Sequence, residues 1–197
     1  MGSIAGWDIL GAVSQGDDRY TELIDRVEAE FPDFRIINKR DSRFQRMIHV
    51  GLVAITFGQM RDYLDGYYTT LGQRLYVTEG WTDIDADDRY ITLCHEVVHM
   101  RQFRRFTPVI MGLLYLLFPL PMGLAWFRAR FEKEAYAETL RASAEVYGLE
   151  FVRSEGVKNR IIGQFTSASY GWMWPFRRSM TRWYDGVVAE LERAHGA

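Results

Sequence analysis

The stretch DDRYITLCHEVVHMRQF, residues 87–103, decides how this 197-residue chain is interpreted, because it holds two histidines four positions apart. The acidic run DIDADD, residues 83–88, supplies N-caps and favourable charge for a helix that begins near Asp87. Positions four apart share one helix face, so His95 and His99 can present both imidazoles to a single ion. The neighbours are mostly apolar, which indicates a largely buried helix.

The HEVVH motif has the residue types that zinc-dependent hydrolysis requires. Two imidazoles and one carboxylate hold the metal, and an open position keeps a water whose pKa falls towards neutrality. Glu96, between the histidines, would take up and deliver the proton as general base. Two histidines around a glutamate also occur by chance, but burying these groups without a metal would cost several kcal/mol. We therefore expect one bound Zn²⁺.

A helix further along the chain offers two candidates for the third ligand. The segment RARFEKEAYAETLRASAEVYG, residues 128–148, contains Glu132 and Glu134, which cannot share a face. Small or apolar residues continue the face of Glu132, namely Ala125, Ala129, Ala135, Tyr136, Thr139, Leu140, Ser143 and Tyr147. Charged residues continue the face of Glu134, namely Arg130, Glu138, Arg141 and Glu145. A ligand must face inward, so the periodicity favours Glu132; Glu134 stays the alternative, because Glu138 one turn later could orient a ligand histidine.

HEVVH on one helix and EKEA, residues 132–135, on a later helix resemble the gluzincin-type zinc metallopeptidases over roughly residues 67–147. The resemblance implies His95, His99 and Glu132 as zinc ligands and Glu96 as general base. It also implies a strand that binds the substrate backbone in extended form, which YYTTLGQRLYV, residues 67–77, could do by strand addition. Many gluzincins have Asp directly after the alanine of the second motif, where this chain has Tyr136.

Stabilisation of the transition state needs a hydrogen-bond donor aimed at the developing oxyanion. Tyr136 and Tyr170 are the candidates. Tyr170 lies in YGWMWPF, residues 170–176, and clustered aromatics of this kind more often form a core or a cleft wall.

Composition narrows the class of protein. The net charge is −2, so the chain lacks the cationic surplus typical of nucleic-acid binders. The single cysteine, Cys94, excludes an internal disulfide and fits a reducing compartment, so the expected location is the cytoplasm.

One apolar segment complicates that expectation. Residues 108–127 carry no charge and have arginines on both sides, but Pro119 and Pro121 would break a spanning helix into two short pieces. Hairpin-like packing is favoured. Contact with a membrane surface is the first alternative, and a membrane span is the least favoured.

The expected fold is α+β and mainly helical, as one zincin-like domain over residues 1–197 with a small sheet or hairpin next to the HExxH helix. Helices are predicted over residues 19–31, 42–63, 125–147 and 179–193, with a strand in FRIIN, residues 34–38, and a hairpin or long strand over 67–81. The predicted function is that of a zinc metallopeptidase acting on peptide or protein substrates. The alternatives are a catalytically silent, zinc-stabilised peptide-binding module and a membrane-surface protein.

Overall fold

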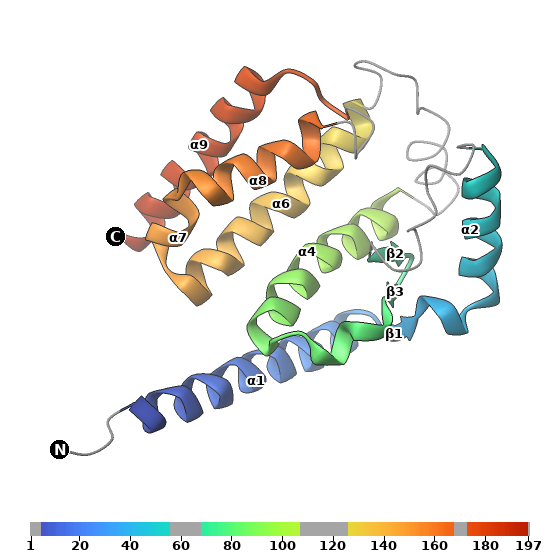
Figure 1. Ribbon diagram of the computed structural model, residues 1–197, viewed down its shortest axis with the longest axis horizontal. Coiled ribbons are helices and arrows are strands. Elements are labelled where there is room, and N and C mark those ends of the chain that lie inside the picture. The colour runs from blue at the N-terminus through green and yellow to red at the C-terminus, as the bar shows by residue number, and fades with distance from the viewer. Residues whose placement is uncertain (1–4, 56–67, 107–125, 168–172, 197) are drawn as a thin grey trace. The chain divides into compact units, whose positions relative to one another are not determined.

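The computed structural model describes residues 5–55, 68–106, 126–167 and 173–196. These residues are mainly helical and include a three-stranded sheet, in agreement with the predicted class. The chain divides into two compact units, Met1–Glu96 and Val97–Ala197. Their boundary falls inside one continuous helix, α4 (Ala86–Arg105), which contributes to both units (Figure 1). A single domain over the whole chain stays a prediction.

The first unit begins with a long helix. α1 spans Ala5–Glu30 and ends just before Pro32, as predicted, but it begins well before residue 19. Gly11 and Gly16 lower the helix propensity of this earlier part, so its local pattern indicates a helix only weakly. β1 (Arg35–Asn38) follows and confirms the strand in FRIIN. The 3₁₀ helix η1 (Lys39–Asp41) then leads to α2 (Arg43–Ile55), and the rest of the second predicted helix lies outside the described residues.

The predicted hairpin is present as β2 (Thr69–Leu71) and β3 (Arg74–Val77). The two strands pair antiparallel with Thr70 opposite Leu75, and β1 pairs parallel with the other side of β3, giving the strand order β1-β3-β2. Gly72 has a φ of +63° in the turn, a conformation that glycine adopts without the penalty of a Cβ atom. The 3₁₀ helix η2 (Glu79–Asp83) connects β3 to α4.

α4 begins where the acidic run predicted. Asp85 Oδ1 accepts a hydrogen bond from the Asp87 backbone N–H at 2.9 Å, which caps the first turn. α1 lies against this end of the helix within the first unit: Arg19 Nη1 donates to Asp87 Oδ1 at 2.6 Å, and a Cβ on Gly16 would come within 3.0 Å of the same oxygen. The start of the helix is therefore held on two sides, by its own cap and by α1.

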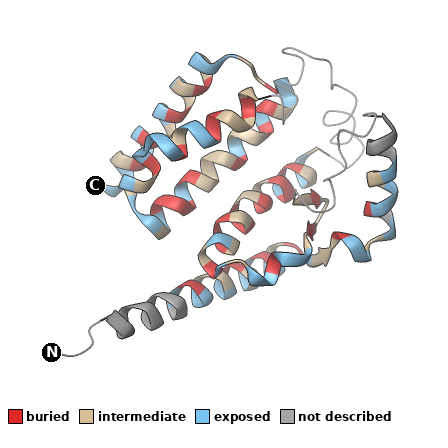
Figure 2. Ribbon diagram, in the orientation of Figure 1, coloured by how far each residue is buried: buried red, intermediate tan, exposed pale blue. Residues whose placement is uncertain are grey.

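The described residues of the second unit form helices and short connections, without a strand. α6 (Trp126–Tyr147) and α9 (Arg177–His195) agree with predicted helices, whereas α7 (Leu149–Arg153) and α8 (Glu155–Thr166) were not predicted. These elements share one apolar cluster, visible as buried residues along α6, α8 and α9 (Figure 2). Its members include Leu140, Val152, Ile161, Ile162, Phe165, Met180, Tyr184 and Leu191. This core supports α6, which carries both candidate third ligands.

Most of the uncharged segment 108–127 lies outside the described residues. Its last two residues, Trp126 and Phe127, begin α6 and are exposed. Among the helices that the structure describes, none combines the length and the apolar character needed to cross a bilayer.

Candidate metal centre

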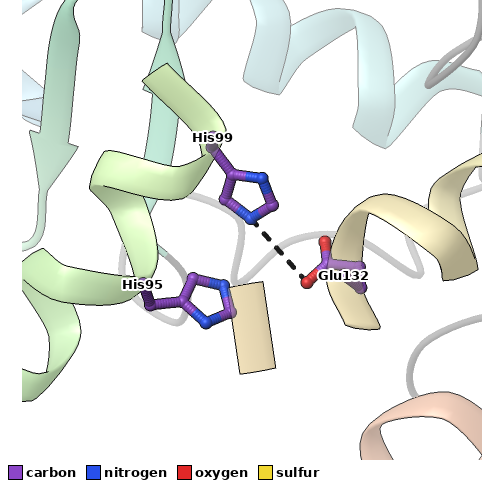
Figure 3. Close-up of side chains that lie close together, drawn as sticks. All are labelled: His95, His99 and Glu132. Carbon is purple, nitrogen blue, oxygen red and sulfur yellow. Dashed lines mark ion pairs between the residues drawn. The ribbon is translucent and has the colours of Figure 1, made fainter. Parts of the chain in front are cut away.

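Two helices bring three potential ligands together. His95 and His99 lie one turn apart on α4, and Glu132 lies in the second turn of α6. One ligand atom from each side chain falls within 4.8 Å of the other two. His99 Nε2 and Glu132 Oε2 are 3.8 Å apart (Figure 3). The structure therefore groups the two histidines of HEVVH with the carboxylate that helix periodicity favoured.

The donor set fits a divalent metal. Two imidazoles and one carboxylate form a ligand set found in catalytic zinc sites, and such a set leaves a coordination position open. Ligand atoms about 2.1 Å from a tetrahedral zinc are about 3.4 Å apart, so the present spacing needs only small side-chain movements. The side chains of His99 and Glu132 are 9% and 13% exposed, so these two potential ligands have little contact with bulk water. No protein-family model, curated protein or solved structure matches this chain.

Glu134 occupies a different environment. Its side chain is 44% exposed, and its carboxylate lies 4.0 Å from Arg130 Nε, one turn earlier on α6. Its Oε2 accepts a hydrogen bond from Gln102 Nε2 at 3.1 Å. The structure therefore places Glu134 outside the group of potential ligands and in contact with Gln102.

Glu96, the predicted general base, is held by the sheet. It is buried, and its Oε2 accepts a hydrogen bond from the Thr70 hydroxyl at 2.7 Å. Thr70 lies in the middle of β2, so this bond joins the strand to the HEVVH helix within the first unit. Sequence reasoning missed Thr70, because nothing in the local pattern distinguishes it from Thr69.

Tyr68, at the start of the hairpin, is a second residue near Glu96 that sequence reasoning did not single out. Burial raises the pKa of its phenol; a hydrogen bond with Thr78 lowers it, and the charges of Asp88 and Glu96 raise it. Its ring packs edge-on against Trp81 at 5.1 Å between centroids. Burial and these two carboxylates therefore favour the protonated phenol of Tyr68 at neutral pH.

The two tyrosines predicted to stabilise an oxyanion are not among the residues that the structure groups at the candidate site. Tyr136 lies one turn after Glu132, and its ring packs against Phe165 at 5.4 Å between centroids, at the edge of the core of the second unit. Tyr170 lies outside the described residues. Oxyanion stabilisation by either residue stays a prediction.

Proposed function

We propose that this chain is a zinc-dependent metallopeptidase of the gluzincin type, with a zincin-like arrangement of its HExxH helix. One observation carries the proposal: the histidines of HEVVH and the glutamate that opens EKEA lie together although they belong to different helices. His95, His99 and Glu132 would hold one Zn²⁺, and Glu96 would act as general base.

A zinc ion in this site would supply Lewis acidity, which lowers the pKa of water to about 7 and polarises a carbonyl group. Glu96 is suited to the proton transfers, because its carboxylate is buried and one of its oxygens is held by Thr70. It would accept the proton of the attacking water and deliver it to the leaving nitrogen. A structural zinc site has no need of a general base, so Glu96 favours a catalytic role.

The described part of the sheet supports a peptide substrate. Among the described strands, β2 lies at one edge of the order β1-β3-β2, where its outer backbone groups could pair with an extended peptide. Thr70 on this strand bonds Glu96 directly. A peptide added to the edge of β2 would therefore lie next to the strand that orients the base.

The decisive experiment combines metal analysis with cleavage of a diverse peptide library by the wild type and by Glu96→Gln. Both proteins should bind one zinc per chain, because Glu96 is not a ligand. Only the wild type should cleave peptides, with a loss in Glu96→Gln of about 10²–10⁴-fold, the usual contribution of a general base. Equal and negligible cleavage by two zinc-loaded proteins would contradict the proposal and favour a zinc-stabilised peptide-binding module.

A further inference from the structure

Gln102 lies next to the proposed metal centre, and both the oxygen and the nitrogen of its side-chain amide make hydrogen bonds. It is 4% exposed, near the end of α4, one turn after His99. Its Oε1 lies 2.9 Å from His99 Nδ1. Its Nε2 lies 3.1 Å from the backbone carbonyl oxygen of Phe131 and 3.1 Å from Glu134 Oε2. All four residues belong to the second unit, so these contacts do not depend on how the two units are placed.

These partners determine which way the amide of Gln102 points. A backbone carbonyl and a carboxylate can only accept hydrogen bonds, so the NH₂ group of Gln102 must face Phe131 and Glu134. The amide oxygen then faces His99, and this oxygen is only an acceptor. In its neutral form, the one that can bind a metal, His99 must therefore carry its proton on Nδ1. Its Nε2 then directs a lone pair to the side where Glu132 lies, as a metal ligand requires.

The same amide also reaches α6 beside the third ligand. Phe131, whose carbonyl accepts from Gln102, directly precedes Glu132. The ring of Phe131 packs against Phe106, just beyond the end of α4, at 5.2 Å between centroids. One buried side chain is thus bonded to a ligand on α4 and to the backbone next to a ligand on α6.

We propose that Gln102 is the positioning residue of the metal centre: it holds His99 in the tautomer that binds metal and sets the approach of α4 to α6. Glu134 assists by accepting the second N–H of the amide, which gives the solvent-facing glutamate of EKEA a role distinct from ligation. This inference rests on the metal site of the proposed function, but it requires no peptidase activity.

The first test measures zinc affinity by competition with a chromogenic chelator. Gln102→Met keeps the length and bulk of the side chain and removes all three hydrogen bonds. It should bind zinc about 10–100-fold more weakly than the wild type, the usual effect of losing a partner of a ligand histidine. The matched control is Gln164→Met on α8, which makes the same change elsewhere in the second unit and should leave zinc affinity unchanged. The visible spectrum of the Co²⁺-loaded protein should change only in Gln102→Met.

The second test uses metal-free protein and the ¹⁵N chemical shifts of its histidine rings, at a pH where the imidazoles are neutral. His99 should show the Nδ1–H tautomer in the wild type and a mixture of tautomers in Gln102→Met. If Gln102→Met does not fold, Glu134→Ala replaces it in both tests, because Glu134 is 44% exposed and its loss removes only one of the three hydrogen bonds of the Gln102 amide. This variant should show smaller changes in the same direction.

The outcomes separate the two proposals. Unchanged zinc affinity in a folded Gln102→Met, or an Nε2–H tautomer of His99 in the wild type, would overturn the role of Gln102. Zinc binding without peptide cleavage would overturn the proposed peptidase function alone, because both readouts for Gln102 are independent of cleavage.

Discussion

At the scale of single residues, Glu132 and Glu134 form a natural pair for testing the third ligand. They have the same side chain and lie two positions apart on α6, but one is grouped with the histidines and the other faces solvent. Glu132→Ala should abolish stoichiometric zinc binding, measured by metal analysis after dialysis, whereas Glu134→Ala should retain one zinc per chain. The reverse result would show that the ion lies on the other face of α6.

Thr70 offers a second test at this scale. Thr70→Val keeps the shape of the side chain and removes the hydroxyl that donates to the buried Glu96 carboxylate. Loss of one partner of a buried hydrogen bond should lower the free energy of unfolding by about 1–3 kcal/mol, measured by urea denaturation. Thr69→Val, one position earlier on the same strand, points to the opposite side and should have a smaller effect. Equal losses in both variants would mean that the bond to Glu96 contributes little.

The parts of the site that sequence could predict are those determined within one helix. The spacing of HEVVH places two imidazoles on one face in any helix, and periodicity favours Glu132 over Glu134. The bonds from Thr70 to Glu96 and from Gln102 to Phe131 join separate elements. Their formation depends on tertiary packing, which no local pattern specifies, so these supporting residues could be recognised only in the structure.

At the scale of elements, the two helices that were not predicted, α7 and α8, differ in the strength of their local signals. α8 has Val157, Ile161 and Phe165 at helical spacing, and Ser154 caps it by accepting from the Val157 backbone N–H at 3.4 Å, so its sequence does carry a local helix signal. α7 is only five residues long and follows Gly148, whose φ is +81°. A helix of that length shows too little periodicity to be recognised, and packing against the core of the second unit maintains it.

Alanine substitutions at two glycines should change the stability of the protein in opposite directions. A Cβ added at Gly72 or at Gly163 would meet no atom within 4 Å, so only the backbone differs between the two sites. Gly72 has a φ of +63°, and Gly72→Ala should destabilise the protein by about 1–2 kcal/mol. Gly163 lies inside α8, and Gly163→Ala should stabilise it by about 0.5–1 kcal/mol. Thermal unfolding of both variants measures the two changes in stability. A stabilising effect of Gly72→Ala would contradict the positive φ of Gly72 in the turn.

At the scale of the whole molecule, metal binding and folding must be coupled if the proposed site exists. The ligands come from two helices, and an unfolded chain does not hold them together, so zinc should bind the folded state preferentially. Free zinc at a hundred times its dissociation constant should then raise the free energy of unfolding by about 2.7 kcal/mol, and a chelator should reverse the change. The measurement is the midpoint of thermal unfolding as zinc is added.

His99→Ala lacks one ligand and should show little or no shift over the same range, because its affinity for zinc is lost. An equal shift in the wild type and in His99→Ala would place the stabilising ion elsewhere on the chain.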